Sequence, residues 1–310
     1  AATGCLNGTF YADPADQLDT VLTLANAAEP EFVAKVAVHA RESGHMKDMP
    51  ALLMAVLAVR DVALLKRVFA RVCDNGKMVR TFVQIIRSGV AGRKSLGSAP
   101  RGLVRRWMAG LRDDQLLGAT IGNDPSFADL VKMVHPKPAD AARRAFYAWA
   151  IGREHVAAEL PACVQAFEAW KRDRTRPLPE VPFQLLTSAP LDRDGWAAIA
   201  RQSSWQATRQ HLNTFARHGV FEVPGLAELV AARLRDAQAI AKARVFPYQV
   251  LAAYRQADAA VPLVVREALQ DALEIAIANV PALDVGVAVC PDVSGSMGSA
   301  ITCLMGPGPS

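Results

Sequence analysis

The sequence predicts an all-helical protein, and three observations carry this prediction. Of the 310 residues, 51% are hydrophobic but only 6% are aromatic, and this aliphatic composition favours helices over strand-rich sandwiches. From about residue 16 to residue 280, apolar residues recur at i, i+3, i+4 and i+7, as in helices that bury one face. Proline or glycine interrupts this pattern every ten to twenty residues. The apolar content also excludes a disordered chain, because it is enough for a large core.

The periodic segments predict two successive groups of helices. The first two helices have start signals in Asp13-Pro14 and Glu29-Pro30, because proline fits the first helical turn, where no backbone donor is needed. Apolar periodicity predicts the others. The first group comprises residues 14–27, 30–43, 49–59, 61–74, 77–88, 100–111, 126–133, 139–151 and 156–171. The second group comprises residues 193–202, 204–218, 225–243, 247–256 and 262–278.

Short helices joined by short loops are typical of an α-solenoid, in which each helical pair buries its apolar face against its neighbours. Helical pairs of about forty residues would match HEAT or armadillo repeats. The charged, proline-rich segment 171–182, KRDRTRPLPEVP, predicts a loop between two halves of the array. We therefore expect one helical module over residues 1–280.

The periodicity changes after residue 280. Residues 283–290, LDVGVAVC, form a short valine-rich apolar run between two prolines, which predicts a buried strand. The segment PDVSGSMGSA follows at once. Residues 281–310 are therefore expected to hold the first strand and loop of an α/β domain, whose remaining elements the sequence given does not contain.

The loop after this strand is a candidate metal site. A carboxylate and two hydroxyls alternate along it and can turn toward one point, as Mg²⁺ requires of its oxygen ligands: Asp292, Ser294 and Ser296. This D-x-S-x-S pattern resembles the metal-ion-dependent adhesion site of von Willebrand factor A domains. The alternative is a polar turn that caps the next element. With three ligands from one loop, we expect Mg²⁺ or another divalent cation to bind only weakly.

A basic window is the second candidate site. The formal net charge is +5, and the 26 residues from 87 to 112 contain no acid. A Gly/Ser-rich loop leads there into a helix, so guanidinium and backbone N–H groups can face one phosphate, with Trp107 as a stacking plane. A solvated basic face is the alternative. The basic residues of the window are Arg87, Arg93, Lys94, Arg101, Arg105, Arg106 and Arg112.

A third candidate is the sequence VHPKP at residues 134–138. Its two prolines stiffen a short connector and hold His135 and Lys137 at a helix junction. There an imidazole can stack on a base or bind a phosphate, although a lone loop histidine also has structural roles.

Other patterns argue against several function classes. The sequence has no nucleophile elbow, P-loop or H-E-x-x-H motif, and no G-x-G-x-x-G follows a strand, so we do not expect an enzyme. The five cysteines are scattered without CxxC spacing, which favours reduced thiols in the cytoplasm. No run of about 18 uncharged apolar residues indicates a membrane-spanning helix.

Taken in order, several segments resemble the Ro autoantigen family, whose RNA-binding module is called TROVE. The segments are GTFYADPADQL, PALLMAVLAV, RSGVAGRKSLGSAPRGLVRRW, FADLVKMVHPKP, PFQLLTSAPL and KARVFPYQVLAAY, followed by the VSGSM loop. The resemblance covers most of residues 5–300.

The resemblance implies a ring of HEAT-like helical pairs with a positively charged central hole, closed by the von Willebrand factor A domain. It implies binding of small non-coding Y RNAs outside the ring and of single-stranded ends of misfolded or precursor RNA through the hole. It also implies an association with an exoribonuclease such as polynucleotide phosphorylase. By this resemblance His135 matches a histidine implicated in Y RNA contact, and the family's basic loop and helix correspond to Arg93, Lys94, Arg101, Arg105 and Arg106.

The chain departs from the family pattern before the HxKP segment. Asn123 and Asp124 stand where family members have a basic helix, which predicts a weakened or altered Y RNA surface. The leading expectation is a non-catalytic RNA-binding scaffold in RNA quality control, decay or maturation. The alternative is an α-solenoid adaptor that binds protein partners along its concave face, for which an apolar or acidic groove would be the distinguishing feature.

Overall fold

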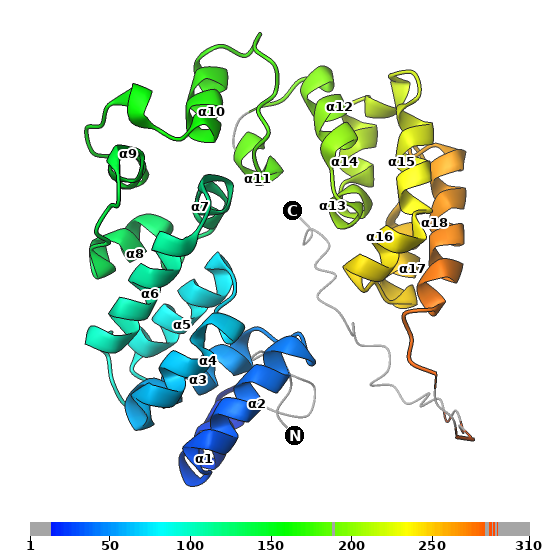
Figure 1. Ribbon diagram of the computed structural model, residues 1–310. Helices are drawn as coiled ribbons and strands as arrows, with labels where there is room; N and C mark the ends of the chain where they lie inside the picture. The colour runs from blue at the N-terminus through cyan, green and yellow to red at the C-terminus, as the bar shows by residue number, and fades with distance from the viewer. Residues whose placement is uncertain (1–13, 188–189, 283–284, 287, 289, 291–310) are drawn as a thin grey trace. The chain divides into compact units, whose positions relative to one another are not determined.

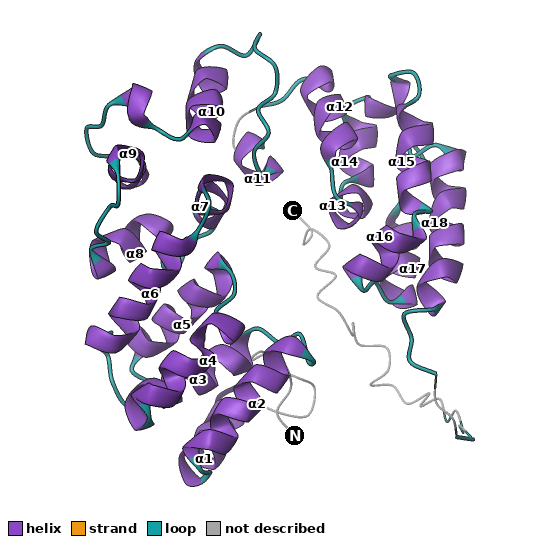
Figure 2. Cartoon of the chain, viewed as in Figure 1, coloured by secondary structure: helices purple, strands orange, loops and turns teal. Residues whose placement is uncertain are grey.

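Every regular element in the described part of the chain is a helix, which confirms the all-helical prediction (Figures 1 and 2). The computed structural model describes residues 14–187, 190–282, 285, 286, 288 and 290. The chain divides into two compact units, Ala1–Leu191 and Asp192–Ser310. No described helix is long and apolar enough to cross a membrane.

The first unit contains a succession of short helices. In chain order they are α1 Pro14–Ala27, α2 Pro30–Glu42, α3 Asp48–Arg60, α4 Val62–Val72, α5 Gly76–Ser88, α6 Ser98–Gly110, α7 Asp113–Ala119, α8 Phe127–Val134, α9 Ala141–Ala150, the 3₁₀ turn η1 Ala157–Glu159, α10 Ala162–Arg172 and α11 Phe183–Leu186.

The second unit has the same character. Its elements are α12 Arg193–Gln202, α13 Trp205–Gln210, α14 Leu212–Arg217, η2 Val220–Glu222, α15 Leu226–Leu234, α16 Ala237–Ala243, α17 Pro247–Gln256 and α18 Leu263–Ile277.

Helix α3 is the centre of the first unit. All residues from Met49 to Ala58 are buried, and the helix packs against α2, α4 and α5. A helix that is apolar on every side must be enclosed by other helices. Helix α5 instead buries one face, which includes Phe82 and Ile86, and the ring of Phe82 meets Phe69 of α4 edge to face at 5.6 Å.

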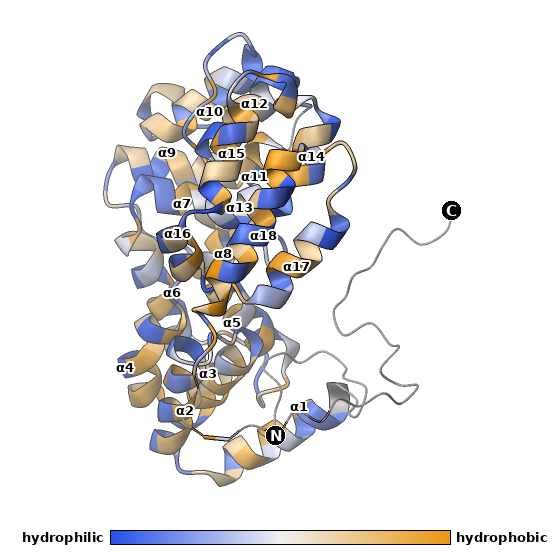
Figure 3. Ribbon diagram, turned by 90° about the vertical axis from the view of Figure 1, so that its right-hand side faces the viewer, coloured by the Kyte–Doolittle hydropathy of each residue, from blue (hydrophilic) through white to orange (hydrophobic). Residues whose placement is uncertain are grey.

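Helix α18 has the corresponding place in the second unit. It packs against α15, α16 and α17. Its buried residues Val265, Ala268, Leu269, Ala272 and Ala276 follow the helical repeat. In Figure 3, the helices carry both hydrophilic and hydrophobic residues, as expected where one face is buried.

Two predicted helices are each interrupted in the structure. Segment 204–218 forms α13 and α14, which meet at His211. Segment 225–243 forms α15 and α16, because the carboxylate of Asp236 accepts a hydrogen bond from the backbone N–H of Ala239 and starts a new helix. The predicted helix 156–171 begins as the turn η1, and α10 starts only after Pro161.

The predicted strand 283–290 is only partly within the described residues. Val285, Gly286, Ala288 and Cys290 are described, and none of them lies in a strand. The expected metal loop with Asp292, Ser294 and Ser296 lies outside the described residues. Segment 171–182 is largely a loop, as predicted, but the division between the units falls later, after Leu191.

We expect Leu57→Ala to destabilise the first unit by about 2–5 kcal/mol, because the Leu57 side chain is fully buried and its removal leaves a cavity. Val59→Ala is the matched control, since Val59 lies on the same helix but is 48% exposed. Urea unfolding followed by circular dichroism measures both. Equal effects of the two substitutions would contradict the central position of α3.

Candidate nucleic-acid interface

Four cations of the basic window are exposed to solvent. Arg87 lies in the last turn of α5, Lys94 lies in the following loop, and Arg101 and Arg106 lie on α6. None of the four forms an ion pair with a carboxylate in the described part of the chain. These four residues, called the exposed cations below, are available for phosphate groups.

Arg93 is in a different situation, because its side chain is turned into the protein. Its Nε donates to the carbonyl of Ser95 (2.8 Å), and a terminal nitrogen donates to the carbonyl of Ala58 at the end of α3 (3.2 Å). Gly97 lies against the guanidinium with a φ of +71°, and a Cβ there would lie 1.9 Å from it. Arg93 therefore fastens the loop to α3.

Arg105 joins the two sequence motifs. Its Nε donates to the carbonyl of Val134, the last residue of α8. His135 follows in the left-handed conformation (φ 48°, ψ 67°) and ends the helix. The contact brings the His135–Pro136–Lys137 connector next to α6, and both His135 and Lys137 are exposed.

Arg112 is paired with an acid that follows it. Its guanidinium lies 3.0 Å from the carboxylate of Asp114, and both groups are largely exposed. The hydrogen bonds from Arg112 lower the pKa of Asp114. Arg112 is therefore paired at the start of α7, and for that reason it is not counted among the four exposed cations defined above.

Acidic residues lie at the beginning of α8. The carboxylate of Asp129 accepts hydrogen bonds from the hydroxyl (2.7 Å) and backbone N–H (3.0 Å) of Ser126. These bonds, together with the charges of Lys132 and Arg87, lower the pKa of Asp129. Asn123 and Asp124 are exposed in the preceding turn. Two acids therefore lie at the beginning of α8, whereas His135 and Lys137 follow its end.

The face of α6 that carries Trp107 differs from the one that carries its arginines. At about 100° per residue, Arg101 and Arg106 lie on either side of Arg105, and Trp107 lies about 120° from Arg101, 100° from Arg106 and 160° from Arg105. Trp107 and the buried Leu103, by contrast, share the apolar side of the helix. The structure thus places Trp107 on the buried side of α6, about 100° or more around the helix from each of its arginines.

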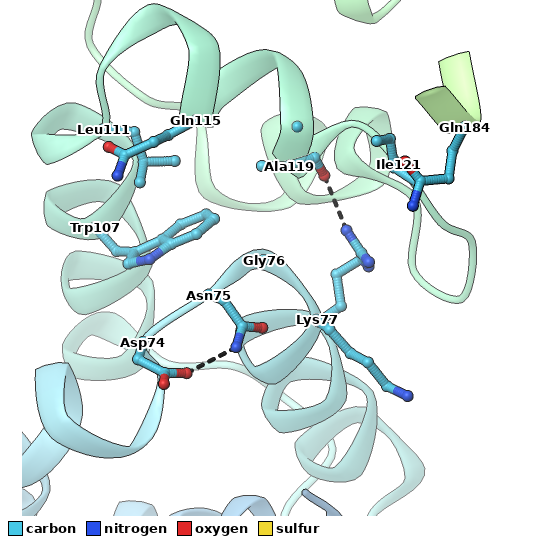
Figure 4. Close-up of a pocket in the computed structure, with 12 residues that line it drawn as sticks. Asp74, Asn75, Gly76, Lys77, Trp107, Leu111, Gln115, Ala119, Ile121 and Gln184 are labelled. Carbon is cyan, nitrogen blue, oxygen red and sulfur yellow. Dashed lines mark hydrogen bonds between the residues drawn. The ribbon is translucent and has the colours of Figure 1, made fainter. Parts of the chain in front are cut away.

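Trp107 lines a cavity of about 420 Å³ within the first unit, between α5, α6, α7 and α11 (Figure 4). Sequence reasoning did not identify this cavity. The one signal in the sequence is Arg80, a charged residue on the apolar face of α5; it is 9% exposed, and burial lowers its pKa. The lining residues are Asp74, Asn75, Gly76, Lys77, Arg80, Trp107, Leu111, Gln115, Gly118, Ala119, Ile121 and Gln184.

The described residues contain no group of three or more His, Cys, Asp or Glu side chains that could hold a metal ion. The Mg²⁺ prediction concerns residues outside that part of the chain and stays a prediction. Burial raises the pKa of the thiols of Cys73 and Cys163, so neither is activated as a nucleophile.

We expect Arg105→Met to destabilise the first unit by about 1–3 kcal/mol, because it leaves the carbonyl at the end of α8 without its donor. Arg101→Met, on the same helix but exposed, is the matched control and should change stability little. Urea unfolding measures the loss, and faster amide exchange at the end of α8 locates it. Unchanged exchange there would contradict the assigned contact.

Comparisons with known proteins bear on the fold. No family model matches the sequence, and no curated protein matches it. The crystal structure of the Deinococcus radiodurans Ro (RSR) protein is similar, with a TM-score of 0.63 and 19% sequence identity. The similarity covers 91% of this chain and 60% of the length of that protein. Over 91% of its length, the chain therefore has the fold of a Ro protein.

Proposed function

We propose that the chain is an RNA-binding scaffold of the Ro type. The observation that carries the proposal is the set of exposed cations, Arg87, Lys94, Arg101 and Arg106, which form no ion pair in the described residues of a chain with the fold of a Ro protein. Unpaired guanidinium and ammonium groups bind the phosphate backbone, which supplies most of the affinity in non-specific RNA recognition.

The proposed scaffold binds RNA without a reaction of its own. The exposed cations hold backbone phosphates, and His135 and Lys137, kept beside α6 by Arg105, contact a structured RNA such as a small Y-like RNA. Single-stranded ends of misfolded or precursor RNA are the second ligand. The proposal also includes a ring-shaped arrangement and a partner exoribonuclease such as polynucleotide phosphorylase. The chain spans 60% of the length of the Deinococcus radiodurans Ro protein.

The metal loop adds a further element to the proposal. Mg²⁺, or another divalent cation, would be held by the Asp292 carboxylate and the Ser294 and Ser296 hydroxyls, which are hard oxygen ligands.

The second candidate function is a protein-binding adaptor. One observation in the second unit favours it: Phe246 and Tyr248 are stacked with ring centroids 6.3 Å apart and are 43% and 58% exposed. Aromatic side chains are enriched at protein interfaces. If a Phe246→Ala/Tyr248→Ala variant binds RNA like the wild type but loses a co-purifying protein, the adaptor function is supported.

We expect Arg101→Gln/Arg106→Gln to weaken binding to a hairpin RNA with a single-stranded tail. The salt dependence of log Kd should also fall by about one unit for each phosphate group that the variant no longer binds. Fluorescence anisotropy at several salt concentrations measures both quantities.

The matched control for this variant is Lys66→Gln/Arg67→Gln, which removes the same charge from exposed positions of α4. If both double variants lose affinity equally, only net charge matters and the assignment of the interface to α6 is wrong. If the wild-type affinity does not depend on salt, the proposed function itself is wrong.

We expect His135→Asn to weaken binding of a hairpin RNA more than binding of a single strand, because the imidazole lies at the connector proposed to contact structured RNA. Asparagine tolerates the left-handed backbone of this position, so the substitution tests the ring and not the turn. His155→Asn, at another exposed histidine, is the control. Equal losses for the two RNAs would remove the special role of His135.

A further inference from the structure

The cavity beside Trp107 has the composition of a nucleobase pocket. Its volume of about 420 Å³ lies in the range of small-ligand sites. In Figure 4 the indole ring of Trp107 extends from α6 into the space between α5 and α7. Leu111 and Ile121 add apolar surface. A flat aromatic ligand can therefore stack on the indole and keep its other contacts with the aliphatic lining.

Polar groups around the ring are available to read the edge of a base. The indole N–H of Trp107 and the side-chain amide of Gln184 have no hydrogen-bond partner in the described structure. The side-chain amide oxygen of Gln115 accepts a hydrogen bond from the backbone N–H of Arg112 (3.1 Å), which leaves the side-chain NH₂ group of Gln115 to donate. Amide side chains offer both donors and acceptors, as base edges require.

The charges of the pocket favour an anionic ligand. Its one acid, Asp74, is already engaged by Arg41 at 2.9 Å and by the amide of Asn75 at 2.8 Å. Two cations remain. Arg80 donates to the carbonyl of Ala119 (2.8 Å) beneath the pocket, and Lys77 lies exposed at its rim without an ion pair in the described residues.

A glycine allows α5 and α7 to pack closely beside the pocket. Gly76 at the start of α5 lies against α7, and a Cβ there would be 3.2 Å from the Cα of Ala119. The absence of a side chain lets the two helices approach closely, so that the cavity has a floor formed by Arg80 and Ala119.

We propose that this cavity binds a nucleotide, with the base on Trp107 and the phosphate at Lys77, and that the occupant is a base of single-stranded RNA. The inference rests on the proposed function, because the exposed cations would hold the rest of the same strand. It adds a stacking site on the buried side of α6, about 100° around the helix from Arg106.

The test compares two labelled RNAs of equal length, decaadenylate and a strand of abasic ribose phosphates, which carries the same charge without bases. We expect Trp107→Leu to weaken decaadenylate binding about 5- to 100-fold and to leave abasic binding unchanged, with Trp107→Phe in between. Phe32→Leu is the control, because it removes an exposed aromatic ring elsewhere in the first unit.

Lys77→Gln should weaken binding of both RNAs and lower the salt slope by about one, whereas Lys66→Gln should not. Adenosine monophosphate, added as a competitor, distinguishes the two sources of the ligand. Competition at micromolar concentrations identifies a free nucleotide as the occupant, and its absence identifies a base within a strand.

Two results would overturn the pocket and leave the proposed function intact: equal decaadenylate affinities of the wild type and Trp107→Leu, or an equal loss on the abasic strand. The second result would show that the substitution damages the fold or the backbone contacts. Failure of the wild type to bind either RNA at any salt concentration would reject the proposed function, and the pocket with it.

Discussion

The fold depends on arginine side chains that reach the carbonyl ends of neighbouring helices. The last turn of a helix leaves carbonyls without intrahelical donors and carries partial negative charge, which a guanidinium with five donors can satisfy. Six helices of the described structure, α1, α3, α6, α7, α8 and α12, end in this way. The pairs are Arg60 with Ala25 and Ala28, Arg93 with Ala58, Arg143 with Leu111, Arg80 with Ala119, Arg105 with Val134, and Arg233 with Ala200 and Arg201.

This constraint gives the basic residues two separate roles. The formal charge of +5 counts arginines that hold helices together as well as those that face solvent. Within the basic window, Arg93 and Arg105 belong to the first kind and the four exposed cations to the second. The arginine–carbonyl contacts help to fix how neighbouring helices are placed against one another.

Sequence patterns predicted most of this fold because the helices are long enough to show their repeat. They missed α7 and α11, which are too short for a periodic signal, and the interruption at Asp236, where one capping side chain outweighs the apolar pattern. The candidate site was less predictable. Whether an arginine meets a carbonyl depends on residues far away in sequence, as Arg105 and Val134 show, and a window of basic residues contains no such information.

Helix α6 shows how these roles are combined on one element. Its three arginines span an arc of about 140°, and Leu103, Trp107, Val104 and Met108 fill the rest of the circumference. Because each residue turns the helix by about 100°, fixing one side chain fixes the direction of all the others. The contact of Arg105 with α8 therefore also sets the direction in which the exposed arginines point and the position of the indole in its cavity. The contact between Arg105 and α8 binds no ligand itself, but it determines the geometry of both proposed RNA contacts.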